Sequence, residues 1–313
     1  SFCTDQVIDI DVAVLFDILY DARIIVPFGS QYCLKFTYWL YYFAAHRMHH
    51  DHNFAELILS DQRYARFPEI VEFYTGIDRQ REDAVNTLAR DLSFGIEAAR
   101  EKCGLPDKLN PYPALKWRPS ENGFQKMEAE LRDGVEASNL PDVIKDRYAD
   151  RNYDRTRPYH QSVRDILTGH TMSSLMLSIS AASRALRNSD YVNPEHRKNL
   201  LSMILQGWRQ ISKVLWVLLP LLVDKGHASF DDANFVLAND FGDDPDERFR
   251  AVLSAIPYNV VKWYQDDLFS PKMASLLTQQ MEDQTDDVIK HTLALFQVAK
   301  RPKGWKSNIE NYI

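Results

Sequence analysis

The chain has 313 residues, a formal net charge of −7, 45% hydrophobic residues and 26% charged residues. This length allows two or three domains with a substantial core, and the composition is that of a folded globular protein. The negative charge balance argues against a protein built to coat the phosphates of nucleic acids.

The first predicted element is a helix over Val7 to Ala22, because apolar residues recur there at three- and four-residue spacing. Val12 to Asp17 also imitates a Walker B strand, but no GxxxxGK phosphate loop occurs anywhere in the sequence. We therefore predict a helix at this position. Pro27-Phe28-Gly29-Ser30 then has the composition of a hairpin turn, which predicts a short β-hairpin.

An aromatic helix follows the hairpin without a break, and it carries a recognisable motif: Trp39, Tyr42, Phe43, Ala44 and Ala45. The segment from Leu34 to Ala45 resembles the one that closes the winged helix of STAND-superfamily signalling NTPases of the NACHT and NB-ARC kind. Three positions depart from the family pattern, namely Phe36, Tyr38 and Tyr41. A second stretch, Glu72 to Ile77, is similar to the helix that begins the helical region after that winged helix.

The resemblance implies an architecture and a division of roles. The winged helix would hold an ATPase module closed at rest, and ATP and magnesium would bind in a missing N-terminal portion, with no cofactor in this chain. Later helices would recognise a protein trigger or pack against other protomers, while an effector domain of the same polypeptide acts. Since the chain opens on Ser1 without an initiator Met, we expect a C-terminal portion of a longer protein.

A histidine-rich cluster ends the aromatic helix and comprises His46, His49, His50, Asp51 and His52. Imidazoles with a carboxylate suit zinc and other transition metals, so a metal-dependent hydrolase is an alternative hypothesis. Arg47 occupies the first ligand position of the HxHxDH signature, and the cluster continues a helix where that signature follows a strand. A solvated cationic helix end, favoured by the helix dipole, is the preferred interpretation.

The remainder of the chain predicts successive helices. Helical patterns run from Phe54 to Ile77 and from Arg79 to Cys103, where Gly104 and Pro106 stop the second. Four prolines between residues 105 and 123 predict an ordered connector, whose Tyr112, Leu115 and Trp117 are apolar enough to dock on a neighbouring surface.

A second irregular stretch runs from Asp146 to Pro158 and contains arginines and aspartates with tyrosines between them. This pattern favours an ion-pair network or a protein-facing surface over a phosphate clamp. Two long apolar helices should follow, over Gln161 to Arg187 and Glu195 to Val223. Asn193 should cap the second of them, with Pro194 in its first turn. Asp240-Phe241-Gly242 matches the kinase DFG by coincidence, because the other kinase motifs are missing.

The last seventy residues predict four short helices, divided at Pro257, at Ser270-Pro271, near Asp283 and at Arg301 to Gly304. The predicted fold class is therefore mainly α. We expect a winged-helix-like unit with a β-hairpin over 1–52, a helical arm over 53–104, the connector over 105–123, and a C-terminal helical sensor domain over 124–313.

The unpaired spacing of Cys3, Cys33 and Cys103 fits reduced thiols of a cytoplasmic protein. Val214 to Val223 is the longest strongly apolar run, and it is too short for a membrane span.

No set of residues with catalytic spacing stands out, so our leading hypothesis is a non-catalytic regulatory and sensor region of a STAND-like NTPase. In prokaryotes such proteins commonly serve antiviral defence. Besides the metal-dependent hydrolase, a second alternative is a winged-helix nucleic-acid binder that uses Arg23 and Lys35. In the leading hypothesis Trp39 is expected to be a buried core residue of the aromatic helix.

Overall fold

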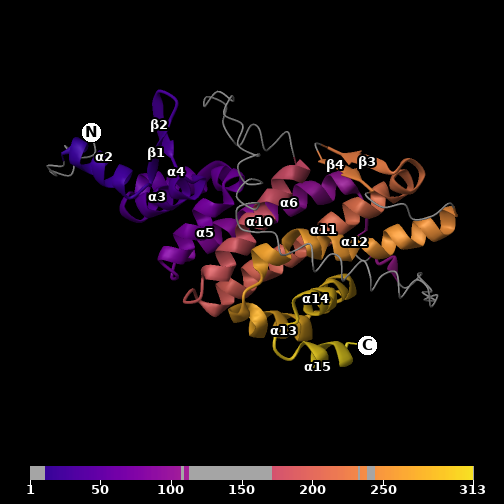
Figure 1. Ribbon diagram of the computed structural model, residues 1–313. Helices are drawn as coiled ribbons and strands as arrows, with labels where there is room; N and C mark the ends of the chain where they lie inside the picture. The colour runs from indigo at the N-terminus through magenta and orange to yellow at the C-terminus, as the bar shows by residue number, and fades with distance from the viewer. Residues whose placement is uncertain (1–10, 107–108, 113–170, 232, 238–243, 313) are drawn as a thin grey trace.

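A computed structural model describes residues 11–106, 109–112, 171–231, 233–237 and 244–312, and its fold is mainly α as predicted (Figure 1). The first four residues of the predicted N-terminal helix lie outside the described residues. So do Leu115, Trp117, the stretch from Asp146 to Pro158 and the DFG tripeptide.

Up to residue 112, the described residues form one hairpin and a series of helices. Its elements are α2 (Val12–Asp21), β1 (Ile25–Phe28), β2 (Gln31–Leu34), α3 (Thr37–His50), α4 (His52–Leu59), the 3-10 helix η1 (Ser60–Arg66), α5 (Pro68–Ile77) and α6 (Glu82–Cys103). The predicted hairpin is confirmed, with antiparallel register between Ile25 and Leu34 and between Phe28 and Gln31. Gly29 has φ 63° in its turn, a left-handed conformation that glycine adopts without a steric cost.

From residue 171 on, the described residues include the two longest of the described helices and a second hairpin. Its elements are α10 (Thr171–Asn188), α11 (Pro194–Lys225), β3 (His227–Phe230), β4 (Ala233–Val236), α12 (Pro245–Leu268), the 3-10 helix η3 (Pro271–Met273), α13 (Ala274–Asp283), α14 (Asp287–Lys300) and α15 (Trp305–Glu310). Helix α11 begins as its sequence predicts: the Asn193 side chain accepts a hydrogen bond from the Glu195 amide, and Pro194 occupies the first turn.

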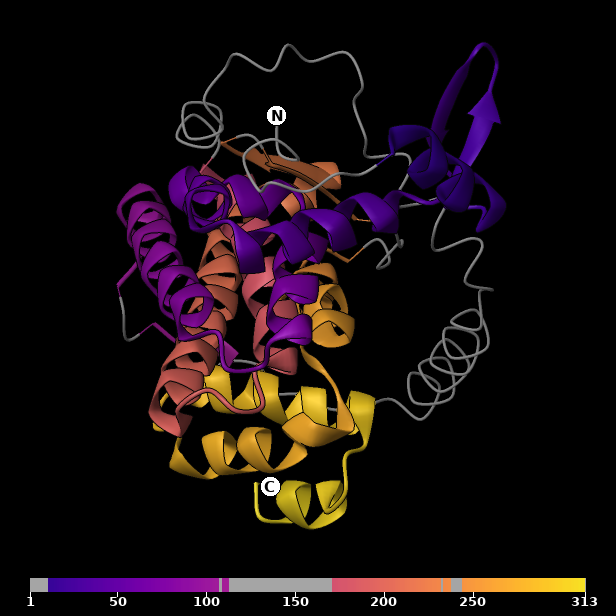
Figure 2. The same ribbon diagram turned by 90° about the vertical axis from the view of Figure 1, so that its left-hand side faces the viewer.

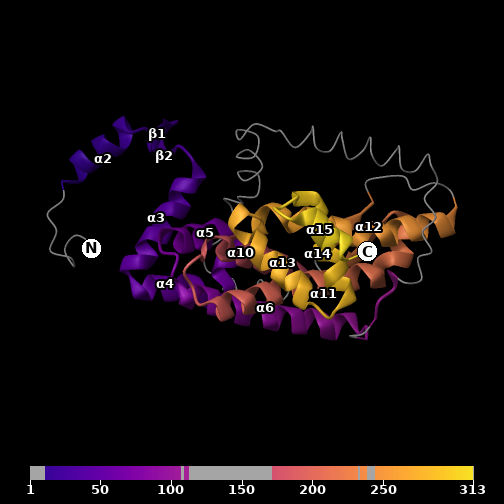
Figure 3. The same ribbon diagram turned by 90° about the horizontal axis from the view of Figure 1, so that it is seen from below.

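The core lies where α5 and α6 pack against α10 and α11 (Figure 3). Gly207 on α11 permits the close approach of α10, because a Cβ at that position would come within 2.7 Å of the Ile179 Cδ1 atom. Trp208, beside it, is buried against Tyr264 of α12 and Phe296 of α14. Helices from the ranges expected as the helical arm and the sensor domain thus share one hydrophobic core.

The connector docks at one described point. Tyr112 packs edge-on against Trp216 of α11, with ring centroids 5.7 Å apart, and lies 5.4 Å from the His291 ring of α14. This contact confirms the apolar docking expected for Tyr112.

One expectation for the C-terminal part is wrong, and one element there was not predicted. Pro257 does not divide two helices, since α12 continues through it. A proline inside a helix removes a hydrogen bond, but Ile256, Val260 and Tyr264 are buried around it, and this tertiary packing offsets the local penalty. The hairpin formed by β3 and β4 is the element that was not predicted. The Gly226 residue before it has φ 71° and ends α11.

Cys33 is an exposed free thiol and Cys103 a half-buried one, while Cys3 lies outside the described residues. Across the described ranges, no helix combines the length and the apolar character needed to cross a membrane.

Candidate functional site

The part of the fold that stands clear of the bundle is the N-terminal arm, which we define as α2, the β1–β2 hairpin and the first half of α3, residues 12–43 (Figure 2). None of the residues of α2 is buried, although its sequence is strongly apolar. Val12 is 72% exposed and Ile18 is 58% exposed. Most of the predicted apolar face of this helix is therefore exposed, and only Phe16 and Leu19 are half-buried.

Aromatic side chains hold the hairpin onto α2. The Tyr32 ring on β2 meets the Phe16 ring edge-on at 4.9 Å and the Tyr20 ring at 6.0 Å, measured between centroids. Phe28, at the tip of the hairpin, is 65% exposed. The hairpin is thus positioned by ring contacts and not by burial in the core.

A second aromatic group covers the start of α3. Its rings, each within 6.1 Å of a neighbour, are those of Phe36, Tyr38, Trp39, Tyr42 and Phe43. The Tyr42 ring also meets Phe73 of α5 edge-on at 5.9 Å, which connects the arm to the bundle. Phe43 and Tyr38 are each 41% exposed.

The core role expected for Trp39 is wrong. The buried residues of α3 are Tyr41, Ala45 and Met48, whereas Trp39 is only half-buried. The four-residue spacing from Tyr41 to Ala45 defines the face that packs on α5, and Trp39 lies on a different face of the same helix. Of the motif residues, Ala45 is fully buried, Ala44 and Tyr42 are half-buried, and Phe43 belongs to the exposed surface.

The histidine cluster lies at the junction between α3 and α4, where its aspartate caps the second helix. Asp51 caps α4 by accepting a hydrogen bond from the Phe54 amide at 2.9 Å, and it pairs with Arg47 at 3.1 Å. These contacts hold the pKa of the Asp51 carboxyl below its usual value. The carboxylate that the metal hypothesis requires is thus engaged in capping.

The histidines of this cluster do not converge. The His49 ring contacts the Tyr74 ring, and its Nε2 atom lies 3.1 Å from the Tyr74 carbonyl oxygen. Burial, followed by the charge of Arg81, lowers the pKa of this imidazole. The exposed rings of His46 and His50 contact each other at a tilted angle, and His52 begins α4. Within the described residues there is no group of three or more His, Cys, Asp or Glu side chains that could hold a metal.

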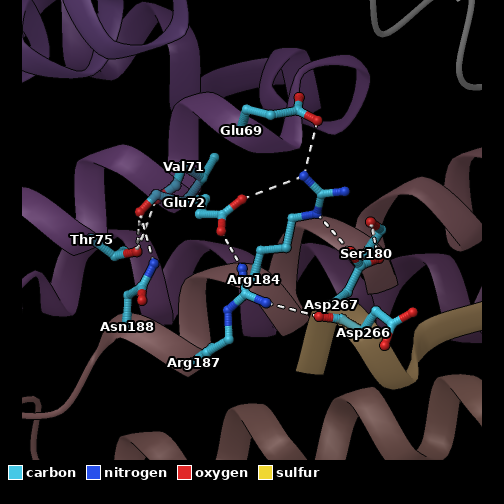
Figure 4. Close-up of polar contacts among 10 residues, drawn as sticks. All are labelled: Glu69, Val71, Glu72, Thr75, Ser180, Arg184, Arg187, Asn188, Asp266 and Asp267. Atoms are coloured by element: carbon cyan, nitrogen blue, oxygen red, sulfur yellow. Dashed lines mark hydrogen bonds and ion pairs between the residues drawn. The ribbon is translucent and has the colours of Figure 1, made fainter. Parts of the chain in front are cut away.

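A network of ion pairs between helices fixes the bundle that carries the arm (Figure 4). Arg184 of α10 contacts Glu69 of α5 at 2.9 Å, Glu72 at 3.4 Å and Asp267 of α12 at 2.7 Å. Burial would lower the pKa of this guanidinium, but the three carboxylates more than offset that effect and raise it. Ser180 donates a further hydrogen bond to Asp267.

A second arginine extends this network by one turn of α10. Arg187 pairs with Glu72 and donates to the Asp266 carbonyl oxygen at 2.8 Å, and Asn188 donates to the Glu72 carbonyl oxygen at 3.1 Å. The sequence analysis did not identify these residues. One feature of the sequence could have indicated the network: Arg184 is an arginine among the apolar positions Ala181, Ala185 and Leu186 of a helical pattern.

The arm has no excess of positive charge. Asp17 and Asp21 balance Arg23 and Lys35, and the Lys35 ammonium lies 5.1 Å from the centre of the Phe36 ring. This balance argues against the nucleic-acid alternative, because phosphate binding needs a local cationic surface.

No protein-family model, curated protein or solved structure matches this chain.

Proposed function

We propose that this chain is a non-catalytic regulatory and sensor region of a STAND-like NTPase that acts in the cytoplasm. The observation that carries the proposal is the N-terminal arm, where a helix, a hairpin and an aromatic helix follow one another and expose apolar side chains. A contiguous exposed apolar surface marks a site of protein interaction. Of the motif residues, Phe43 is exposed on the arm, and the half-buried rings of Trp39 and Tyr42 contact it.

The proposed occupant of this surface is the ATPase module of the same polypeptide. The family resemblance supports this choice, and so does the balanced charge of the arm, which favours an apolar protein surface over an ionic partner. The arm holds the ATPase module closed at rest, with ATP and magnesium bound in that module. The helices after the arm recognise a protein trigger or pack against other protomers, and an effector domain then executes the response, in antiviral defence.

The coding region upstream of Ser1 gives the first test. The proposal requires that this region encode a GxxxxGK phosphate loop followed by a Walker B strand. A short upstream region without a phosphate loop would overturn it.

The second test uses the full-length polypeptide and its basal ATP hydrolysis. Replacing Tyr38 and Phe43 together by alanine removes exposed apolar area from the arm, so the arm should release the ATPase module and the rate should rise several-fold. Phe94→Ala is the matched control, because Phe94 is a 66% exposed aromatic residue on α6, outside the arm.

Two results would contradict the proposed occupant. One is an unchanged hydrolysis rate in the double variant with the same melting temperature as the unmodified protein. The other is a loss of dimerisation in light scattering with the rate unaffected, which would assign the surface to a second copy of the chain.

A further inference from the structure

A cluster of basic residues lies in the turn between α14 and α15, at the edge of the bundle away from the N-terminal arm (Figures 1 and 2). We define it as the basic turn, residues 300–306, with the cations Lys300, Arg301, Lys303 and Lys306. No acidic residue occurs between positions 298 and 309, although the whole chain has 44 acidic and 37 basic residues. The basic turn is therefore a local concentration of positive charge on an acidic protein.

Three of the four cations are available to a partner. Lys300 forms an ion pair with Asp266 of α12. The side chains of Arg301, Lys303 and Lys306 are exposed, and none of them forms an ion pair with another described residue. A partner that carries negative charge would therefore find three cations that no carboxylate of the described chain neutralises.

Arg301 occupies a position that glycine would fill at a lower cost. It ends α14 in the left-handed backbone conformation, with φ 48°. The same conformation ends α6 and α11, but there the residues are Gly104 and Gly226. A Cβ atom is crowded in this conformation, so folding alone favours glycine at position 301.

Lys306 also has an unfavourable position for folding. It lies in the first turn of α15, where the positive end of the helix dipole disfavours a cation. Four of the longer helices, α6, α11, α12 and α14, instead carry acidic residues in their first turns. Folding explains neither Arg301 nor Lys306, and this points to a role of the two cations outside the fold.

Trp305 holds these two cations around one aromatic ring. The guanidinium carbon of Arg301 lies 5.7 Å from the centre of the Trp305 ring, and the Nζ atom of Lys306 lies 5.9 Å from it. Asn308 anchors the same helix on α13, because its Nδ2 atom donates a hydrogen bond to the Thr278 hydroxyl at 3.0 Å. The positive charges are thus arranged before any partner binds.

The surroundings of Trp305 favour the surface of an anionic membrane over a nucleic acid. Its ring is half-buried and contacts both cations, so it does not offer a free face on which a base could stack. Val298, one turn before Arg301, adds an apolar side chain that is 43% exposed. Tryptophan beside basic and apolar side chains is typical of the interface between a membrane and water.

We propose that the basic turn binds reversibly to the anionic head groups of a lipid membrane. Arg301, Lys303 and Lys306 contact the head groups, and Trp305 lies at the interface. Each Lys or Arg near an anionic lipid surface strengthens binding roughly fivefold, so three of them together give about a hundredfold preference over a neutral surface. The inference uses residues outside the arm and holds whether or not the arm contacts an ATPase module.

Co-sedimentation with lipid vesicles tests the proposal on the purified chain. The chain should bind vesicles that contain phosphatidylserine, should not bind vesicles of phosphatidylcholine alone, and should dissociate when the salt concentration is raised. Absence of binding to the phosphatidylserine vesicles at low salt would overturn the proposal.

A labelled DNA duplex is the second probe, because its phosphates would also attract a cationic surface. Duplex binding that depends on Lys303 and Lys306, without binding of the vesicles, would assign the basic turn to a nucleic acid and contradict the membrane proposal.

Variants then locate the binding surface. Lys303→Gln combined with Lys306→Gln should weaken vesicle binding roughly twentyfold. Arg301→Gly should weaken it roughly fivefold and also raise the melting temperature, because glycine adopts the left-handed conformation without a steric cost. A gain in stability together with a loss of affinity is the expected signature of Arg301.

Lys35→Gln combined with Lys225→Gln is the matched control. It removes the same charge from two exposed lysines outside the basic turn, one in the arm and one in the last turn of α11. Vesicle binding should stay unchanged in this variant. An equal loss of binding in both double variants would show that the net charge of the protein, and not the basic turn, determines binding, and the proposal would be wrong.

Discussion

Arg184 shows how one side chain can connect three helices. Its guanidinium has carboxylates from α5 and α12 within 3.4 Å, while its backbone belongs to α10. A partly buried cation in such a setting is stabilised only while its partners are present, and the partners repel one another without it. Arg47, in contrast, pairs with Asp51 at the surface, where an ion pair contributes little to the free energy of unfolding.

We predict that Arg184→Met lowers the free energy of unfolding by about 3 kcal/mol, because Glu69, Glu72 and Asp267 then lie together without a counter-charge. Urea denaturation followed by circular dichroism measures this change.

Arg47→Met is the control for this prediction, and its denaturation midpoint should match that of the unmodified protein. The denaturation midpoint of Arg184→Lys should lie between those of the two methionine variants. A lysine keeps the positive charge but lacks the planar guanidinium that can contact several carboxylates at once. An Arg184→Met protein as stable as Arg47→Met would show that the network contributes nothing.

At the level of the elements, local signals in the sequence predicted those helices whose ends carry their own caps. Asn193 and Pro194 begin α11, and Gly104, with φ 66°, ends α6. Tertiary packing decided the remaining cases. Helix α12 continues through Pro257 because its neighbours bury both sides of the proline, and periodicity alone does not reveal which neighbours a helix will have.

The candidate site was predicted only in part for the same reason. The hairpin and the aromatic helix follow from turn composition and periodicity, but the face of α3 that becomes buried depends on the position of α5. The ion-pair network joins residues from helices that are distant in the sequence, and no local pattern predicts such pairings.

The arm supplies a prediction at the scale of elements. Tyr32→Ala removes the ring that meets Phe16 and Tyr20, so the hairpin should open more often and the amides of β1 and β2 should exchange faster with deuterium. The amides of α11 should keep their protection, because the ring contacts of Tyr32 are with α2 and not with α11.

Tyr191→Ala is the control for this experiment, since Tyr191 is 70% exposed in the loop before α11. Equal exchange of the hairpin amides in Tyr32→Ala and Tyr191→Ala would mean that the aromatic contacts do not hold the hairpin.

For the whole molecule, stability should depend on pH through its half-buried histidines, His291 and His49. Burial lowers the pKa of His291 below its ordinary value of 6.5, and its Nδ1 atom lies 2.9 Å from the Tyr312 hydroxyl. The unfolded chain therefore binds more protons than the folded chain below about pH 6.5, and stability falls as the pH decreases through that range. His49 contributes with the same sign.

We predict that the melting temperature falls between about pH 7 and about pH 5, and that His291→Gln makes this fall smaller. Differential scanning calorimetry at several pH values measures the effect. Asp83 and Asp231 have lowered pKa values, so in the folded chain they take up protons only at still lower pH. They therefore do not contribute to the change in melting temperature between about pH 7 and about pH 5. A pH profile of His291→Gln identical to that of the unmodified chain would contradict the prediction.

The positions of the partners of Arg184 in the sequence also set the order in which its ion pairs can form during synthesis. Glu69 lies 115 residues before Arg184 and Asp267 lies 83 residues after it. While the ribosome is still making α12, a finished α10 can pair with α5 but lacks its third carboxylate. Final closure of the bundle therefore waits for the chain to emerge past Asp267, and a polypeptide truncated before that residue would keep Arg184 on an unfinished surface, open to chaperones and proteases.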